Sequence, residues 1–375
     1  MDWLNQAINP TLTINVGDIL KLPYNDFVDK LPLDISRMLQ IAKNDWDSFE
    51  TSWDFQSLPM LADGLRQPTL AASYAAWERQ CRDNIQTMQS LEEENNRLFI
   101  EAYGLQEELS PAVPEEQITL ARPDRAEDIK RLVSYAIGCM MGRYSLDEPG
   151  LVYAQAGNEG FDPTRYARFP ADDDGIIPLT DIDWFADDPT NRFAQFLAVA
   201  WPKEQERENL AFVAESLDQK RGELPLDVVR RYLNRDFFKD HLKTYKKRPI
   251  YWLFSSGKEK AFECLVYLHR YHRGTLSRMR MEYVTPLQSR MRGRVEQLLE
   301  EITAAPSTVI RNKAQKTLDK LRKQQEELAL FDERVRHYAD QRITLDLDDG
   351  VKVNYGKFGN LLAEVAAITG AKGDD

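Results

Sequence analysis

Hydrophobic residues recur every three or four positions over several long stretches of this chain, which is the spacing of one face of an α-helix. The longest stretches predict helices at 68–103, 124–141, 274–303 and 307–341. Shorter ones predict helices near 33–44, 191–200, 204–218 and 226–234. Because Ala305-Pro306 separates two helices of similar length, residues 274–341 are expected to form an antiparallel helical hairpin.

Other segments have the alternating or clustered apolar residues of β-strands. A strand is predicted at 9–19, a buried strand at 249–256, and a β-hairpin at 343–355 that turns at Asp348-Asp349-Gly350. Between 150 and 188 the chain is rich in Asp, Pro, Gly and aromatic residues, which predicts loops and short strands such as 175–179. The predicted fold class is α+β, mostly helical, with long helices and a helical hairpin around a smaller mixed α/β domain.

Length and composition agree with a globular protein. The 375 residues correspond to two or three domains, and 42% hydrophobic residues are enough for packed cores. No window approaches the roughly 18 apolar residues of a membrane span, and Met1-Asp2-Trp3 does not begin a secretory signal. Cys81, Cys139 and Cys264 are too widely spaced for a disulfide framework or a zinc site. These features predict a reduced, cytoplasmic protein without a membrane partner.

The net charge of −12 is unevenly distributed. Residues 1–224 contain 20 Lys and Arg against 40 Asp and Glu, whereas residues 225–345 contain 26 against 15. A polyanion binds a local surface rather than the mean charge of a protein, so the basic third could bind phosphate. The alternative is that this region only balances the acidic half of the same molecule. Charge alone leaves both interpretations open.

Several common catalytic motifs are missing. The chain has neither a Gly-x-Gly-x-x-Gly fingerprint nor a Walker-type phosphate loop. The strings nearest to the Asn-Pro-Pro-Tyr element of adenine methyltransferases, Asn9-Pro10-Thr11 and Asp188-Pro189-Thr190, lack the second proline and the aromatic residue. Asp124 and Asp128 lie four residues apart in one predicted helix, whereas the metal-binding acids of nucleases come from separate strands.

The remaining candidates for catalysis are equally weak. His269 and His272 lie beside Cys264 but find no further metal ligands in the sequence. Ser255-Ser256-Gly257 lacks the Gly-x-Ser-x-Gly elbow of a nucleophile. The sequence therefore predicts no catalytic residue, no cofactor-binding residue and no metal site in this chain.

The positive signal is a basic segment around the predicted strand 249–256. Lysine and arginine precede and follow this strand, interleaved with Tyr, His and Ser, which together can contact phosphates and base edges. The candidate DNA-binding residues are Lys243, Lys246, Lys247, Arg248, Ser255, Lys258, Arg270 and Arg273. Tyr251 and Phe254 are expected on the opposite face from Trp252, with one face of the strand packed inward and the other toward the DNA groove. Gly257 is expected to let the next turn approach a DNA backbone closely.

Several segments of the sequence resemble a known family. They are Trp46-Asp47-Ser48-Phe49-Glu50-Thr51-Ser52-Trp53-Asp54-Phe55, the segment Ser134 to Asp147, the segment Tyr245 to Lys258, and Val353-Asn354-Tyr355-Gly356-Lys357-Phe358-Gly359, together with Asn9-Pro10-Thr11 and Asn15-Val16-Gly17-Asp18-Ile19. In the same order, they resemble the C-terminal half of PglX, the adenine-specific DNA methyltransferase family of BREX phage-defence systems. Related segments occur in single-chain restriction–modification enzymes.

The resemblance implies a division of labour between this chain and an absent methyltransferase domain. In the family that domain precedes this region, binds S-adenosylmethionine and flips out the target adenine. This chain then looks like the C-terminal portion alone, either a cut fragment or a split subunit. The implied regions are a helical connector at 1–148, a target-recognition domain at 149–273, and at 274–375 the helical hairpin with a C-terminal β-hairpin and helix.

The resemblance also implies partners. Double-stranded DNA and the methyltransferase domain are the expected ones, and other BREX proteins are further candidates. No methyltransferase activity is expected from the chain alone. The alternative function is a protein-interaction module that docks other defence-system subunits without reading DNA. The resemblance does not transfer individual base-contacting residues, because recognition loops vary most among such proteins.

Overall fold

The computed structural model describes residues 32–370, so the predicted strand at 9–19 lies outside the described residues. Contacts between residues divide the chain into two compact units. The first contains the described residues up to Trp46 together with Glu78–Arg122, and the second contains Asp47–Trp77 and Pro123 onward. This division differs from the predicted boundaries after 148 and 273, which stay predictions. No helix among residues 32–370 is long and apolar enough to cross a membrane.

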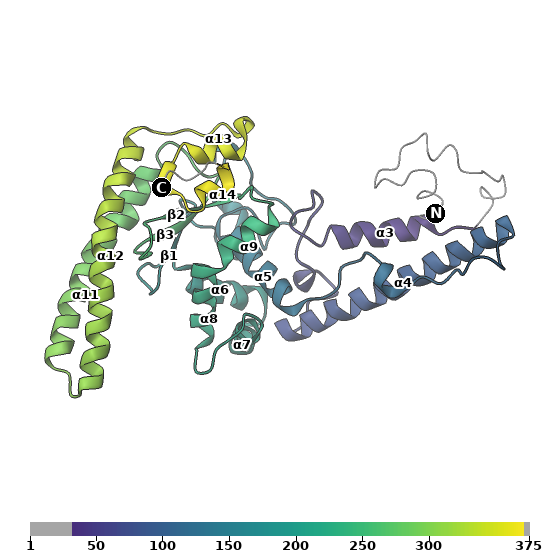
Figure 1. Cartoon of the computed structure of the whole chain (residues 1–375), viewed down its shortest axis with the longest axis horizontal. Helices are drawn as coiled ribbons and strands as arrows, with labels where there is room; N and C mark the ends of the chain where they lie inside the picture. Colours follow the sequence, from purple (N-terminus) through teal and green to yellow (C-terminus); the bar gives the residue numbers. More distant parts are fainter. Residues whose placement is uncertain (1–31, 371–375) are drawn as a thin grey trace. The chain divides into compact units, whose positions relative to one another are not determined.

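The first unit consists mainly of α3 (Ile35–Trp46) and the larger part of α4 (Leu70–Tyr103), as predicted from their periodicity. The two helices lie side by side (Figure 1). Ile85 and Met88 of α4 form a small core with residues of the segment that returns along it, namely Val113, Ile118 and Leu120, and with Met38 and Ile41 of α3. Asp45 at the end of α3 accepts a hydrogen bond from the Ala121 backbone N–H at 3.0 Å, which ties both ends of this unit together.

The second unit contains most of the helices and the only strands among the described residues. Its α-helices are α5 (Arg125–Met140), α6 (Pro189–Ala200), α7 (Glu206–Ser216), α8 (Pro225–Arg235), α9 (Phe237–Thr244), α10 (Thr275–Arg278), α11 (Thr285–Thr303), α12 (Thr308–Asp340), α13 (Gly350–Gly356) and α14 (Val365–Thr369). Its strands are β1 (Ile176–Leu179), β2 (Tyr251–Ser255) and β3 (Glu263–Tyr267). The mostly helical α+β class is confirmed.

The three strands form an antiparallel sheet in the order β1-β3-β2. The register pairs Tyr251 with Tyr267 and Ser255 with Glu263 across β2 and β3. All four residues of β1, all five of β3 and the first four of β2 are buried. A sheet buried on both faces has no alternation of polar and apolar residues, which explains why β3 was not predicted from the sequence.

Both faces of β2 are covered by protein, which corrects the prediction that one face meets DNA. The Tyr251 ring stacks on His241 of α9 at 4.9 Å between centroids. On the opposite face, Trp252 and Phe254 both pack edge-on against Phe358. Residues two apart in a strand share a face, so the expected separation of Phe254 from Trp252 was wrong.

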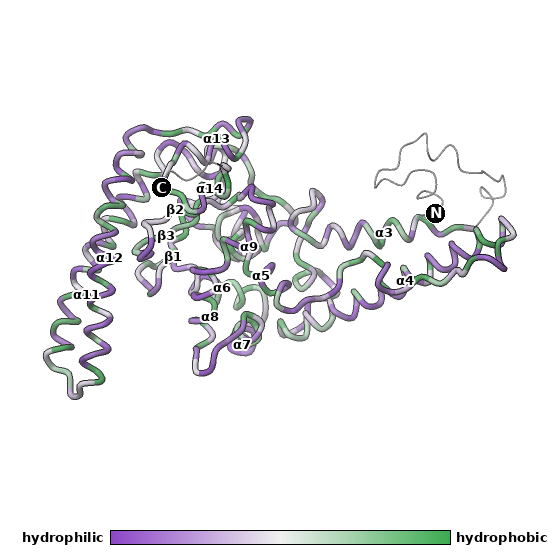
Figure 2. The backbone as a smooth tube through the Cα atoms, in the orientation of Figure 1, coloured by the Kyte–Doolittle hydropathy of each residue, from purple (hydrophilic) through white to green (hydrophobic). Residues whose placement is uncertain are grey.

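The predicted helical hairpin is present. The α11 and α12 helices lie antiparallel, side by side over their length (Figure 1), and Ser307 begins α12 by accepting a hydrogen bond from the Ile310 N–H. Hydrophobic and hydrophilic residues alternate around both helices (Figure 2), and buried Leu298, Leu318 and Leu328 belong to the apolar seams. A π-helical turn, η7 (Met279–Val284), precedes α11.

The β-hairpin predicted at 343–355 does not form, because residues 347–355 are helical. A 3-10 turn at Leu347–Asp349 leads into α13. The buried Asn354 side chain donates hydrogen bonds to the backbone oxygens of Asp346 and Gly350 and so closes this turn. Packing of Tyr355 and Phe358 on Trp252 buries one face of this segment, and this long-range contact overrides the local alternation of the sequence.

Candidate nucleic-acid interface

Most of the predicted basic residues lie on α9 and the turn that follows it. Lys243, Lys246, Lys247 and Arg248 are all exposed. The helix ends with the Lys247 N–H donating to the Leu242 oxygen at 2.7 Å and the Arg248 N–H donating to the Tyr245 oxygen. These bonds turn the chain into β2 and leave the four cationic side chains in solvent.

Two more cations extend this surface. We use the name basic strip for Arg235, Lys239, Lys243, Lys246, Lys247 and Arg248, all of them exposed. None of these six forms an ion pair with a described residue, and Asp240 is occupied by Lys130 and by the Tyr232 hydroxyl. Asp236 is the one exposed acid between them. The basic strip therefore presents a net positive charge that the protein does not neutralise.

Two lysines of the strip have an unusual backbone. Lys246 has φ 50° and Lys247 has φ 61°, in the left-handed region where a residue other than glycine costs about 1–2 kcal/mol. Glycine would fill these positions more easily. Lysine at these two positions therefore has a backbone cost that no ion pair with a residue between 32 and 370 offsets.

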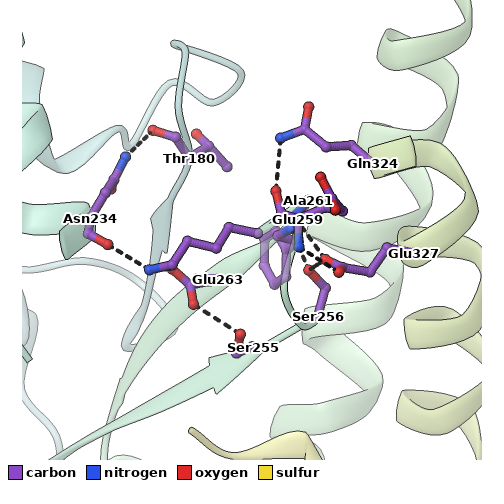
Figure 3. A network of polar contacts seen from close by, with 11 residues as sticks. Thr180, Asn234, Ser255, Ser256, Glu259, Ala261, Glu263, Gln324 and Glu327 are labelled. Carbon is purple, nitrogen blue, oxygen red and sulfur yellow. Dashed lines mark hydrogen bonds and ion pairs between the residues drawn. The ribbon is translucent and has the colours of Figure 1, made fainter. Parts of the chain in front are cut away.

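The turn between β2 and β3 lies at the other end of β2 from Lys246 and packs against α12 (Figure 3). Glu327 of α12 accepts hydrogen bonds from the Ser256 hydroxyl at 2.6 Å and from the backbone N–H groups of Glu259 and Ala261. A side chain at Gly257 would lie 2.9 Å from the Glu327 carboxylate. The close approach expected of Gly257 is thus to α12 and not to DNA.

Ser255 and Lys258 have different surroundings at this turn. The Ser255 hydroxyl donates to Glu263 at 2.9 Å (Figure 3), so it is held within the protein. Lys258 is exposed and forms no ion pair with a described residue. It lines a cleft of about 530 Å³ together with Arg235, Lys260 and residues of α8 and α12. Lys258 and Arg235, which is one end of the basic strip, therefore line the same cleft.

Arg270 is buried, which corrects the expectation that it extends the exposed surface. It is 1% exposed, and its guanidinium donates to Asn158 at 3.0 Å and to the backbone oxygens of Asp172 and Asp173 at 2.5 and 2.8 Å. The same group lies 3.8 Å from the centre of the Phe161 ring. Each of the three guanidinium nitrogens of Arg270 thus donates to a protein acceptor. Arg273, three residues later, is exposed.

A buried charged cluster lies beneath the basic strip, and sequence reasoning missed it. The Glu50 carboxylate accepts a hydrogen bond from Ser134 of α5 at 2.7 Å. Burial raises the pKa of Glu50, while Ser134, Arg143 and Arg131 act in the opposite direction. The Arg143 guanidinium donates to the Tyr267 hydroxyl at 3.4 Å and lies over the Tyr144 ring. Its Nε and the second carboxylate oxygen of Glu50 are buried without a hydrogen-bond partner.

This cluster also supports the C-terminal end of α9. His241 accepts hydrogen bonds at Nε2 from the backbone N–H groups of Ile250 and Tyr251, at 3.1 and 3.2 Å. Burial lowers the pKa of His241 to about 3, so its ring is neutral near pH 7. Tyr245, directly before the two left-handed lysines, packs on the same ring at 4.7 Å between centroids. The buried groups thereby hold the strip's backbone in place.

Comparisons with known proteins point to one enzyme class. No family model matches the chain. It is 44% identical to the adenine-specific methyltransferase BrxX of Escherichia coli O9:H4 (strain HS), over 99% of this chain and 32% of that protein. It is 39% identical to the adenine-specific methyltransferase PglX of Lacticaseibacillus casei (strain Zhang), over 94% of this chain and 30% of that protein. The chain is homologous to one part of these methyltransferases. It spans about a third of the length of the curated relatives that it matches.

The segments that carry the methyltransferase resemblance meet in space. Glu50 belongs to the Trp46–Phe55 string, Ser134 and Arg143 to the second string, and Tyr245 to the third, and all contribute to the buried cluster. Tyr355 of the closing string covers the opposite face of β2. These strings therefore contribute to one core, and that core positions the basic strip.

The acidic residues considered for catalysis form a helix cap and an ion pair. Asp124 begins α5 by accepting hydrogen bonds from the N–H groups of Ala126 and Glu127, and Asp128 pairs with Arg131. Burial lowers the pKa of His269 to about 4. No group of three or more His, Cys, Asp or Glu side chains within residues 32–370 is arranged to hold a metal ion. The expected lack of catalytic, cofactor and metal residues stays a prediction.

Two carboxylates share one phenol at the base of the hairpin. The Tyr283 hydroxyl of η7 lies 2.8 Å from Asp187 and 3.2 Å from Asp174. Burial raises the pKa of Asp174 to about 8, with Asp172 adding to the shift, and burial raises the pKa of Asp187 to about 6. One hydroxyl donates to one acceptor at a time, so ionising both acids leaves one of them poorly compensated.

Asp174→Asn is expected to reduce the stability that the protein loses between pH 5 and pH 8.5. The unchanged chain should lose more free energy of unfolding over this range than the variant. Because the folded-state pKa of Asp174 is raised, its stabilising contribution is complete below about pH 4 and is lost as the pH rises through 8. The amide stays neutral and removes this loss, which we expect to amount to about 1–3 kcal/mol. Urea unfolding at both pH values measures it. Asp173→Asn, at an exposed neighbour, serves as the control. Equal pH dependence in all three proteins would contradict the assignment.

Proposed function

We propose that this chain is the DNA target-recognition portion of an adenine-specific methyltransferase, acting in a BREX-type phage-defence system as the resemblance implies. The observation that carries the proposal is the basic strip, six exposed cations on one segment that form no ion pair with a described residue. Homology to about a third of two adenine-specific methyltransferases supplies the enzyme class. In this proposal the chain holds double-stranded DNA, and a separate methyltransferase domain binds S-adenosylmethionine and methylates the flipped adenine.

Phosphate contacts explain how such a strip would act. Lysine and arginine side chains bind phosphate oxygens irrespective of sequence, so the strip would orient the duplex while other residues read the bases. Each phosphate that is neutralised releases counterions and adds about −0.9 to the slope of log K against log salt. Duplex binding by the whole chain, measured by fluorescence anisotropy from 50 to 300 mM NaCl, should therefore weaken steeply with salt. No binding at 50 mM NaCl would favour the protein-interaction alternative.

Lys246→Gly with Lys247→Gly is expected to weaken duplex binding without weakening the fold. Glycine relieves the left-handed backbone, so the free energy of unfolding should stay unchanged or rise by up to about 1 kcal/mol. Loss of two phosphate contacts should reduce the salt slope by about 1.8. At 100 mM NaCl we expect roughly 10- to 50-fold weaker binding.

A matched control exists for this double variant. Arg342 is also exposed and left-handed, with φ 48°, but it lies after α12 and outside the strip. Arg342→Gly should leave the affinity and the salt slope unchanged. If the double variant binds like the unchanged chain, the basic strip is not the DNA surface, even where the chain binds DNA elsewhere.

A further inference from the structure

A row of lysines follows one face of α12. Lys313, Lys316, Lys320 and Lys323 are separated by three, four and three positions, so they lie on the same side of the helix. We call these four residues the lysine row. All four are exposed, and Lys313, Lys316 and Lys323 form no ion pair with a described residue. Lys320 pairs with Asp181 at 2.5 Å.

The row is unfavourable for the hairpin itself. Like charges three or four positions apart on a helix destabilise it by about 0.2–0.5 kcal/mol per pair. Some other cations of the hairpin have carboxylate partners, as Arg280 does with Asp332 and Arg294 with Glu301. Arg311 and Arg322 of α12 have none among the described residues, but they lie eleven positions apart and not at the spacing of three or four that brings like charges together on a helix. Three unpaired lysines on one face are therefore not explained by the stability of α12, and they favour an anionic partner.

The lysine row leads into the cleft described above. Lys320 and Gln324 of α12 form one side of the cleft, and Arg235 and Asn234 at the end of α8 line it as well. Three of the five carboxylates of its lining are paired with cations, Asp181 with Lys320, Glu223 with Arg231 and Glu263 with Lys260, whereas Asp227 and Glu259 form no ion pair with a described residue. Arg235 and Lys258 have no such partner among the described residues and are exposed.

Dimensions fit a nucleic-acid backbone. From Lys313 to Lys323 the helix rises about 15 Å, at 1.5 Å per residue. One strand of duplex DNA carries a phosphate for about every 3.4 Å of helix axis, so the row is as long as a tract of roughly four phosphates. The cleft joins this tract to the basic strip, because Arg235 belongs to both.

We infer that the lysine row and the cleft between α8 and α12 hold a second tract of the DNA backbone, so that the helical hairpin forms one wall of the duplex-binding surface. The inference rests on the proposed function, since it assigns a further part of the same DNA interface. Lys313, Lys316 and Lys323 contact phosphates from the hairpin side, and Arg235 and Lys258 do so from the other side of the cleft.

The direct test is the triple variant Lys313→Gln, Lys316→Gln, Lys323→Gln in the whole chain. Loss of three phosphate contacts should reduce the salt slope of duplex binding by up to about 2.7. At 100 mM NaCl, affinity should fall roughly 10- to 100-fold. Circular dichroism and urea unfolding should match the unchanged chain, because all three side chains are exposed and unpaired.

The control changes the same charge on the same helix. Arg311, Arg322 and Arg336 are exposed on the opposite side of α12. Replacing all three with glutamine should leave the affinity and the salt slope as they are. An equal loss in both triple variants would overturn the inference, because it would report only the net charge of the protein.

The remaining outcomes separate this inference from the proposed function. If the chain binds duplex with a steep salt slope and the lysine-row variant binds equally well, the inference fails while the proposed function stands. An acidic protein would then be the class of partner to seek for the row. If the unchanged chain binds no duplex, the proposed function fails and the inference fails with it.

Discussion

Replacing Arg143 with methionine is expected to lower the free energy of unfolding by about 2–4 kcal/mol. The Glu50 carboxylate lies in the interior, where Ser134 donates a hydrogen bond to it and Arg143, ahead of Arg131, supplies a compensating positive charge. Methionine keeps much of the side-chain volume but removes the charge, so the buried Glu50 carboxylate loses the larger of its two compensating charges. Urea unfolding at pH 7 measures the loss.

A double-mutant cycle assigns this loss to the charge. Glu50→Gln removes the buried negative charge that Arg143 compensates. In the double variant with Arg143→Met, the free energy of unfolding should therefore be at least about 1 kcal/mol higher than in Arg143→Met alone. Arg125→Met is the control, because Arg125 pairs with Glu215 at the surface and should cost below about 1 kcal/mol. If the double variant is as unstable as Arg143→Met alone, the two charges are not coupled. A fold weakened at this cluster should also lose duplex affinity, since Tyr245 connects it to the basic strip.

Local periodicity predicted the long helices because the residues that form each apolar face lie close together in the sequence. The predicted ends of α4 and α5 lie within two residues of the observed ones, and in α5 the Asp124 cap is itself a local signal. The helical hairpin followed from the same pattern and from the break at Pro306. These features depend on residues three or four positions apart, which sequence reasoning can compare directly.

Features that depend on distant partners could not be predicted in this way. The β3 strand pairs with β1 and β2 and is buried on both faces, so its sequence has no alternation. The segment 350–356 alternates like a strand, but packing of Tyr355 on Trp252 buries it as a helix. Gly257 was correctly singled out as a close approach, yet the approaching group is Glu327, 70 positions later.

The candidate interface likewise contains residues that the sequence predicted and residues that it did not. The exposed cations at 243–248 were found because they are neighbours in the sequence and nothing distant covers them. The lysine row was overlooked although its spacing is visible in the sequence, because the apolar seam of α12 accounted for the whole helix. Its meaning depends on the cleft, which α8, α12 and the β2–β3 turn build together. We propose that the two surfaces form one interface, which the charge variants test.

Arg270 is the clearest case in which surroundings decide between a DNA contact and a structural role. Its basic neighbours in the sequence favoured DNA binding, but its three acceptors are about a hundred positions earlier in the chain. Arg270→Ala should lower the free energy of unfolding by about 3–5 kcal/mol, since it removes the donor to the backbone oxygens of Asp172 and Asp173 and the packing on Phe161. Arg270→Lys should retain less than half of the stability that Arg270→Ala loses, because an ammonium group cannot reproduce three donors in one plane.

Duplex binding then separates the two roles of Arg270. Measured at 15 °C without denaturant, where the lysine variant stays folded, its salt slope should equal that of the unchanged chain. The Lys246→Gly, Lys247→Gly variant should show the opposite behaviour, with full stability and a slope reduced by about 1.8. A folded Arg270→Lys protein whose slope falls by about 0.9 would mean that the guanidinium contacts phosphate, and the interior position assigned to it here would be wrong.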